Sequence, residues 1–188
     1  MSEQMRVRPT FRVMTVCTGN ICRSPMAEVV LRDRFETAGL GARVVVDSTG
    51  ISSEERGKPI DRRARAVLAA HGFRVPVRAA RPVRATDLLA SDLVLAMTSV
   101  HARALRRLAG PDAGRVVMFR SFDPAAPRVA PGTGEHVLDV DDPWYGGPAD
   151  FEDCLVQIEA AADAVVAHVR AAVDARDIET RAAPGARG

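Results

Sequence analysis

Short apolar runs alternate with longer amphipathic stretches along most of the chain. The short runs are rich in β-branched residues and end in polar or glycine-containing turns, which predicts buried strands at 11–16, 43–47, 92–97 and 115–119. The longer stretches carry apolar residues at spacings of three and four, which predicts helices at about 24–38, 61–71, 99–109 and 151–169. This alternation predicts an α/β fold, a doubly wound four-stranded parallel sheet with helices on both faces.

Length and composition indicate one soluble globular domain. The chain has 188 residues, of which 47% are hydrophobic and 27% charged, with a formal net charge of +2. We place the single domain at residues 10–172. Flexible termini are expected at 1–9, which is polar, and at 173–188, where the composition turns to Arg, Ala, Asp, Gly and Pro.

Charge, cysteines and apolar runs limit the partners and the location. Basic residues are interspersed with acidic ones and form no run with aromatics, which argues against a nucleic-acid partner. No apolar run approaches the ~20 residues that cross a bilayer, and no secretory leader is found. Three cysteines suit a reducing compartment. We therefore expect a cytoplasmic protein with no membrane partner, with export without a leader left open.

The loop after the first predicted strand carries the candidate chemistry. It reads Cys17-Thr18-Gly19-Asn20-Ile21-Cys22-Arg23-Ser24-Pro25. Such a loop can turn successive N–H groups toward one centre, and the helix that starts behind it adds positive potential, so we predict a phosphate-binding loop. Arg23 would supply a planar bidentate donor. Cys17 would lie at the floor as a thiolate at neutral pH, suited to attack on phosphorus.

A proton donor is expected in the proline-broken segment from 121 to 145. A leaving alkoxide or phenoxide needs a proton, and a positioned acid contributes about 10²–10⁴-fold to the rate. Asp139, Asp141 and Asp142 lie here, next to Pro143-Trp144-Tyr145. Long loops in compact domains are often functional, and an acid flanked by aromatics could close over an aromatic ester.

The loop signature and the Asp142-Pro143-Trp144-Tyr145 motif together resemble the low-molecular-weight protein tyrosine phosphatases, and the order of strands and helices agrees over about 11–170. The resemblance implies hydrolysis of phosphotyrosine through a cysteinyl-phosphate on Cys17. Arg23 would bind the phosphoryl oxygens, and Asp142 would be general acid and then general base. The resemblance implies no metal or other cofactor. The expected partners are phosphotyrosine-containing proteins, which implies a tyrosine kinase system.

The same resemblance assigns roles to the rest of the loop. Asn20 matches the residue that holds the loop in shape, and Ser24 the hydroxyl that steadies the thiolate. Cys22 becomes a reversible disulfide partner of Cys17, although a packing role for Cys22 stays open. The remaining phosphate-binding positions are Thr18, Gly19 and Ile21.

The substrate mouth shows one departure from the family. Trp144 and Tyr145 match residues that line the mouth, although both could be loop anchors only. Bacterial relatives have an aromatic residue a few positions after the second strand, where a gapless reading puts Glu54. A carboxylate there repels a phosphate dianion and gives the ring nothing to stack on. We therefore expect weak affinity for plain aryl phosphates and a preference for peptides with basic neighbours.

Several other readings remain. Asp141 competes with Asp142 as the acid, although the family has its acid directly before the proline. Arginine phosphatases share the signature but carry threonine at the position of Ile21 and lack the aromatic pair. Arsenate reductases need a cysteine relay, and 73–100 contains no cysteine. A non-catalytic phosphate-binding module would be expected to lose Cys17, Arg23 or Asp142.

The other cysteine and the histidines suggest no chemistry. Cys154 adjoins the apolar stripe of the last predicted helix, which favours a packed core thiol. The four histidines occur singly and without metal-ligand spacing, so they are expected to be structural or exposed: His71, His101, His136 and His168.

Overall fold

A parallel sheet of four strands forms the centre of the computed structural model, which describes residues 10–182. The strands are β1 (Phe11–Cys17), β2 (Val44–Gly50), β3 (Leu93–Ala96) and β4 (Val116–Met118). Their order is β2-β1-β3-β4, and every pairing is parallel. The predicted doubly wound sheet is therefore confirmed.

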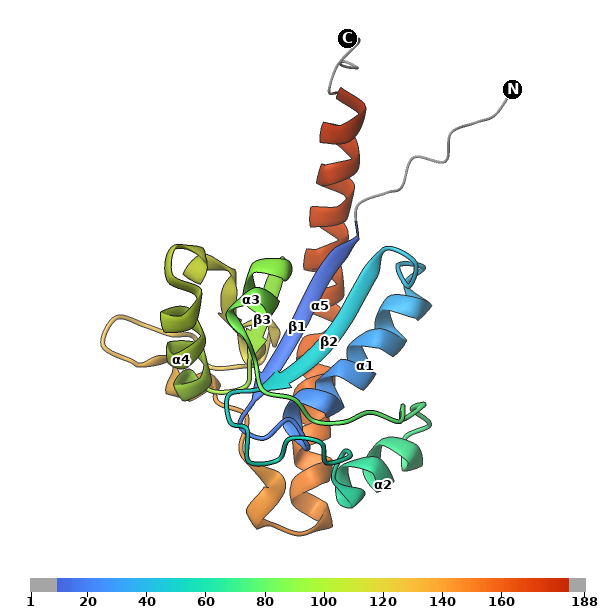
Figure 1. The fold of residues 1–188 in the computed structure, drawn as a ribbon, viewed down its shortest axis with the longest axis vertical. Coiled ribbons are helices and arrows are strands. Elements are labelled where there is room, and N and C mark those ends of the chain that lie inside the picture. Colours follow the sequence, from blue (N-terminus) through green and yellow to red (C-terminus); the bar gives the residue numbers. More distant parts are fainter. Residues whose placement is uncertain (1–9, 183–188) are drawn as a thin grey trace.

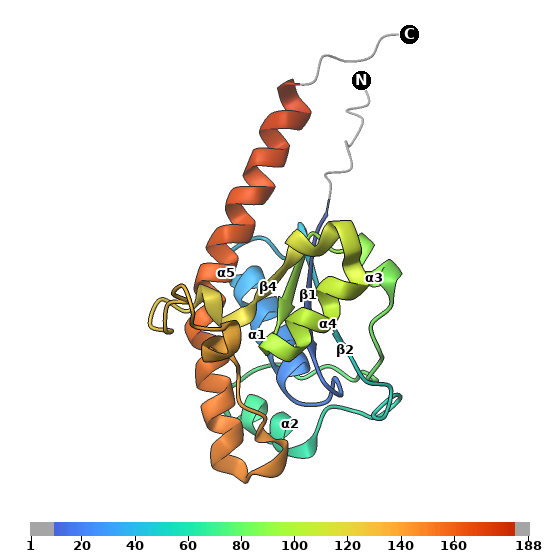
Figure 2. The same ribbon diagram turned by 90° about the vertical axis from the view of Figure 1, so that its left-hand side faces the viewer.

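Helices cover both faces of the sheet (Figure 2). They are α1 (Arg23–Thr37), α2 (Arg62–Ala70), α3 (Ala85–Ala90), α4 (Ser99–Ala109) and α5 (Pro148–Ala182). Short 3₁₀ turns lie between α4 and α5, at Gly110–Arg115, Phe119–Phe122, Glu135–Leu138 and Pro143–Tyr145. Helices α1 and α5 pack on one face, and α3 and α4 on the other. Within the described residues, none of the helices combines the length and apolar character needed to cross a membrane.

Alternation along the strands divides the core in two. Val13 and Val46 point toward α1 and α5, whereas Met14 and Val16 point toward α3 and α4. All four side chains are buried. Strand β3, whose four residues are all buried, appears in the sequence as a continuous apolar run because a strand covered on both faces has no polar alternation.

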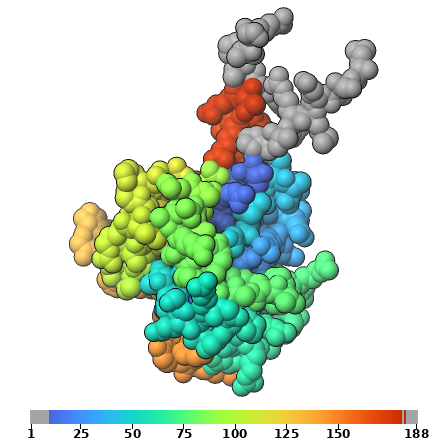
Figure 3. All heavy atoms as spheres, in the orientation of Figure 1, coloured from blue at the N-terminus to red at the C-terminus, as the bar shows by residue number. Residues whose placement is uncertain are grey.

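The strand register brings the ends of the strands to one edge. Cys17, the last residue of β1, pairs with Gly50, the last residue of β2. On the other side, Val16 pairs with Ala96 at the end of β3. The loops that leave β1 and β2 therefore emerge together (Figure 1), and in the space-filling view the segment after β2 faces the viewer (Figure 3). Parallel sheets bind ligands at this edge.

The last helix is longer than predicted, because α5 continues to Ala182, and the flexibility expected from residue 173 stays a prediction. Val173 is buried, and beyond it two ion pairs hold the helix: Arg43 with Asp177 at 2.8 Å, and Arg176 with Asp92 at 2.7 Å. Alanine, arginine and glutamate also favour helix. The predictions of flexibility for 1–9 and 183–188 lie outside the described residues.

Candidate active site

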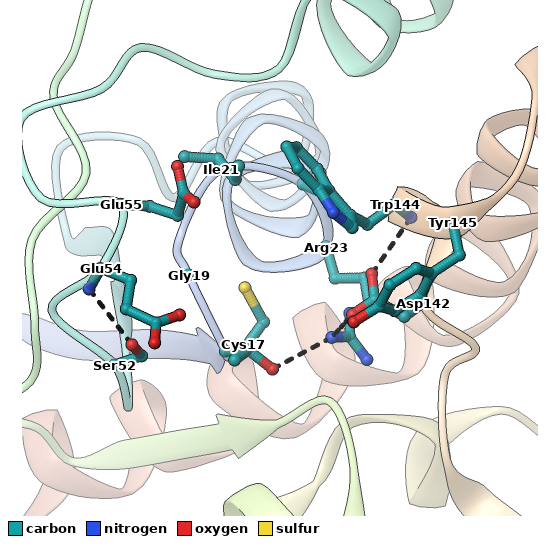
Figure 4. Close-up of a pocket in the computed structure, with 12 residues that line it drawn as sticks. Cys17, Gly19, Ile21, Arg23, Ser52, Glu54, Glu55, Asp142, Trp144 and Tyr145 are labelled. Carbon is teal, nitrogen blue, oxygen red and sulfur yellow. Dashed lines mark hydrogen bonds and ion pairs between the residues drawn. The ribbon is translucent and has the colours of Figure 1, made fainter.

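A cavity of about 120 Å³ lies at the edge where β1 and β2 end. Three segments line it: the loop from Cys17 to Arg23, the segment after β2 at 52–55, and the segment 142–145 before α5 (Figure 4). Residues that are more than 100 positions apart thus meet here. Four of the predicted phosphate-binding residues also line the cavity: Thr18, Gly19, Ile21 and Cys22.

Cys17 is buried at the floor of the cavity. Its sulfur lies 3.0 Å from the hydroxyl of Ser24 and 3.3 Å from the backbone N of Asn20. The Asn20 backbone N donates to the sulfur, and the Ser24 hydroxyl is close enough to do so. Helix α1 begins at Arg23, one residue before the predicted start, and has no side-chain cap. The Ser24 hydroxyl contacts Cys17, Asn20 and Thr49.

Asn20 holds the loop in a left-handed turn, with φ of 60°. Its side-chain nitrogen donates to the hydroxyls of Ser24 at 3.0 Å and Ser48 at 2.8 Å. Its side-chain oxygen accepts from Arg78 at 2.6 Å and from the backbone N of Arg81 at 3.0 Å. Asparagine tolerates this backbone conformation better than most residues. With both ends of the amide bonded and Asn20 buried, the turn is fixed.

Gly50 lets β2 approach the loop closely. A Cβ atom on Gly50 would lie 2.5 Å from the backbone O of Thr18 and 3.1 Å from the backbone N of Asn20. These contacts are with backbone, which cannot rotate away. A side chain at this position would therefore distort the loop.

Arg23 provides the positive charge of the cavity. Its side chain is 5% exposed, and Nη2 lies 2.5 Å from an oxygen of Asp142. Nη1 donates to the backbone O of Val140 at 3.1 Å, and Nη2 also contacts the hydroxyl of Thr18 at 3.3 Å. Nε is buried and has no hydrogen-bond partner within residues 10–182. A buried N–H of this kind is a ready donor for an oxyanion.

The two competing aspartates lie in different places. Asp142 lines the cavity, and its second oxygen accepts from the backbone N of Trp144 at 3.2 Å. Asp141 does not line it, and lies with Asp142 along a neighbouring cavity of about 260 Å³. Only Asp142 contacts Arg23. Of the two carboxyl groups, Asp142 is therefore the one that lies in the cavity with Cys17 and Arg23.

The aromatic pair forms part of the rim. Trp144 is 42% exposed and Tyr145 is 89% exposed. Arg63, in the first turn of α2, donates to the backbone O atoms of Trp144 at 3.3 Å and Gly146 at 2.9 Å. The guanidinium carbon of Arg63 also lies 5.4 Å from the centre of the Trp144 ring. Arg63 therefore ties the acid-bearing segment to α2.

Two glutamates face the aromatic pair across the cavity (Figure 4). Glu54 lines the cavity and is exposed, as predicted for the mouth. Glu55 also lines it, which the sequence analysis missed, and its carboxylate pairs with Lys58 at 2.7 Å. Of the two, only Glu54 is without an ion pair among the contacts of the described residues. Its charge is the less compensated one.

Comparison with known proteins identifies the family. A family model described as low molecular weight phosphotyrosine protein phosphatase matches residues 12–175. The chain belongs to this family. A low molecular weight protein-tyrosine-phosphatase of Streptomyces coelicolor is 49% identical over 169 residues, covering 89% of this chain and 98% of that protein. The low molecular weight protein-tyrosine phosphatase A of Mycobacterium tuberculosis is 47% identical over 149 residues, covering 79% of this chain and 85% of that protein.

Solved structures agree on the fold. A protein tyrosine phosphatase from Entamoeba histolytica, with Hepes in the active site, superposes with a TM-score of 0.78 at 26% identity, over 87% of this chain and 99% of that one. The YwlE arginine phosphatase superposes with a TM-score of 0.70 at 23% identity, over 85% and 96%. The latter shows a shared fold only. Members of the low molecular weight phosphatase family are phosphoric monoester hydrolases, so the predicted enzyme class is confirmed.

The other two cysteines of this phosphatase are buried. Burial, together with the negative charge of Asp61, raises the pKa of the Cys22 thiol far above its usual range. Burial also raises the pKa of Cys154 to about 12. Cys154 packs in the core beside Leu155 and Ile158, which confirms the prediction of a packed core thiol.

Sequence reasoning did not place His101 at this phosphatase site. It was expected to be structural or exposed, and it is buried, with its Nε2 3.0 Å from the hydroxyl of Thr18. Burial and the charge of Arg23 lower the pKa of His101 to about 3. Arg78, which donates to the backbone O and the side chain of Asn20, was missed as well. Neither belongs to a local motif, so no sequence signal marked them.

Proposed function

We propose that this protein is a protein tyrosine phosphatase that hydrolyses phosphotyrosine through a cysteinyl-phosphate on Cys17. The observation that carries the proposal is the meeting of Cys17, Arg23 and Asp142 in one cavity. A nucleophile, a fixed cation and a proton donor are what two-step hydrolysis of a phosphate ester requires. The proposed phosphatase domain is a single unit at residues 10–172, with the end of α5 continuing to Ala182.

In the first step, the Cys17 sulfur bonds to phosphorus while the bond from phosphorus to the phenolic oxygen breaks. Asp142, in its acid form, donates its proton to the departing oxygen. Arg23 binds phosphoryl oxygens through Nε, which has no other partner in the described chain, and through Nη2. Because Nη2 contacts Asp142, the carboxyl group must turn from the guanidinium toward the leaving group as the phosphate binds.

In the second step, water attacks the cysteinyl-phosphate. The Asp142 carboxylate takes a proton from the water as its oxygen bonds to phosphorus. The sulfur–phosphorus bond breaks, its electron pair returns to Cys17, and inorganic phosphate leaves. Asp142 is again an acid, and the cycle balances without another reactant.

The rim supports an aromatic substrate over phosphoarginine, which is the alternative within the family. Trp144 and Tyr145 offer exposed aromatic surface for a phenyl ring. Ile21 lines the cavity with an apolar side chain and has no hydroxyl to orient a guanidinium phosphate. Glu54 adds a negative charge at the mouth, which supports a preference for substrates with basic neighbours.

The test is the initial rate of phosphate release from matched phosphotyrosine and phosphoarginine peptides under reducing conditions, with wild type and Cys17→Ser. We expect wild type to prefer phosphotyrosine and Cys17→Ser to release no phosphate above background. A preference for phosphoarginine would contradict the substrate, and full activity of Cys17→Ser would contradict the nucleophile.

We also propose that Cys22 protects Cys17 from irreversible oxidation. Peroxide converts the Cys17 thiolate to a sulfenic acid, and the Cys22 thiol displaces water from it to form a disulfide, which a thiol reductant reopens. Both cysteines line the same cavity. Activity after peroxide followed by dithiothreitol is expected to recover in wild type and not in Cys22→Ser. Equal recovery would assign Cys22 to packing.

The proposed activity also implies a source of substrate and a cellular location. Phosphotyrosine is made by tyrosine kinases, so a kinase system is the proposed source of substrate. The three free cysteines support a reducing, cytoplasmic location. A tagged protein followed by fractionation tests the location, and recovery outside the cytoplasm would contradict it.

A further inference from the structure

His101 is held rigidly beside the phosphate-binding loop. It lies in the first turn of α4, where its backbone N donates to the cap residue Thr98 at 3.3 Å. Its side chain is buried, with Nε2 at 3.0 Å from the Thr18 hydroxyl. The other ring nitrogen, Nδ1, is buried and has no hydrogen-bond partner in the described part of the chain. Only one of the two ring nitrogens is therefore satisfied.

The Thr18 hydroxyl connects this ring to the cavity. Thr18 follows Cys17 directly, lines the cavity and is exposed there. Its oxygen accepts from Arg23 Nη2 at 3.3 Å. A threonine hydroxyl has one hydrogen and two lone pairs. His101 uses either the remaining lone pair or the hydrogen of Thr18, and the other one is left for a group in the cavity.

The ring nitrogen of His101 that carries the proton decides whether His101 donates to Thr18 or accepts from it. The ring is neutral at ordinary pH, because burial and the nearby Arg23 lower its pKa to about 3. A proton on Nδ1 would leave a buried N–H without an acceptor, which proteins avoid more strictly than an unused acceptor. The proton therefore belongs on Nε2, which then donates to Thr18. With both lone pairs taken by Arg23 and His101, the Thr18 hydrogen points away from both.

We propose that the Thr18 hydroxyl is a further hydrogen-bond donor to the phosphoryl group and that His101 is the positioning residue that orients it. The proposal rests on the proposed function of the cavity. The donor is the side-chain hydroxyl of Thr18. His101, which lies on α4 and not in the loop, fixes the direction of its O–H bond. It stabilises negative charge on the phosphoryl oxygens next to the contact made by Arg23.

Paired variants test this arrangement with p-nitrophenyl phosphate as substrate. Thr18→Val removes the hydroxyl and His101→Leu removes the ring that orients it, and each is expected to lower kcat/KM about tenfold. The double variant is expected to lose about tenfold as well, since both changes remove the same hydrogen bond. Thr18→Ser and His101→Gln, which keep the donors, should recover most of the activity.

Two results would overturn the proposal: a loss of about a hundredfold in the double variant, or an unchanged kcat/KM in His101→Leu. Urea unfolding of each variant separates a loss of folded protein from a loss of rate. The inhibition constant of orthovanadate provides a second readout, expected to rise in Thr18→Val and not in Thr18→Ser.

Nitrogen-15 NMR of the imidazole rings reads the tautomer directly, with the His101 signals assigned by their absence in His101→Gln. A proton on Nε2, retained between pH 5 and pH 8, supports the proposal, and a proton on Nδ1 overturns it. This spectrum and the vanadate affinity do not need turnover. If wild type hydrolyses no phosphate ester, the proposed function fails, while these two measurements still decide the role of Thr18 and His101.

Discussion

Wild type is expected to lose about 2 kcal/mol of its free energy of unfolding between pH 7 and pH 5 because of His101. Replacing His101 by glutamine should remove this loss. Burial and the charge of Arg23 lower the pKa of His101 to about 3 in the folded protein, against about 6.5 in an unfolded chain. Between these values the unfolded state binds a proton that the folded state does not. The free energy of unfolding therefore falls as the pH falls through 6.5. From pH 7 to pH 5 the difference is about 1.5 pH units at 1.36 kcal/mol each, or about 2 kcal/mol.

The assay is urea unfolding at pH 7 and pH 5 of wild type, His101→Gln and the control His136→Gln. His136 is exposed, so its replacement is the matched control for the loss of a histidine. Wild type and control are expected to lose about 2 kcal/mol more than His101→Gln on acidification. The absolute stability of His101→Gln does not enter, because each protein is compared with itself. An equal loss in all three proteins would refute the reasoning that His101 is buried and neutral.

Three further changes probe the site. Asp142→Asn is expected to lower kcat about 10²–10⁴-fold for phenyl phosphate and less for p-nitrophenyl phosphate, which has the better leaving group. An equal loss for both would remove Asp142 from the acid role. The variant should also bind orthovanadate more tightly, because Arg23 is freed. Glu54→Gln should raise kcat/KM for a phosphotyrosine peptide without basic neighbours about twofold to fivefold at low salt, and an effect that persists undiminished at high salt would contradict a charge mechanism. Gly50→Ala should lower the free energy of unfolding by about 2 kcal/mol, which urea unfolding measures. It should also distort the loop at Thr18 and so lower kcat/KM. An unchanged kcat/KM would show that the loop tolerates a side chain there.

The sheet and most helices follow from periodicity, and the exceptions have physical causes. Helix α3 has six residues, and Leu88 is its only buried side chain, so it leaves no apolar pattern to detect. The end of α5 was predicted as flexible because its composition is polar. Its anchors are ion pairs from Arg176 to Asp92 and from Asp177 to Arg43, 84 and 134 positions away. Contacts over such distances in sequence cannot be seen before the chain is folded.

The candidate site was predictable where its residues form local motifs. The loop from Cys17 to Arg23 lies between a strand and a helix, and Asp142 precedes a proline and two aromatics. The supporting residues were not predictable. His101 meets Thr18 across 83 positions, and Arg78 meets Asn20 across 58. In an arginine-rich chain, no local feature separates Arg78 from arginines on the surface.

The central claim is that Cys17 carries the phosphoryl group during turnover. Rapid-quench reaction of wild type with phosphotyrosine peptide, followed by mass spectrometry of the digested protein, tests it most directly. The account predicts one added phosphoryl group on the peptide that contains Cys17, and its accumulation in an Asp142→Asn variant if breakdown of the intermediate becomes the slower step. Turnover of phosphotyrosine by wild type and Cys17→Ser alike, with no phosphoryl group on this peptide, would contradict it.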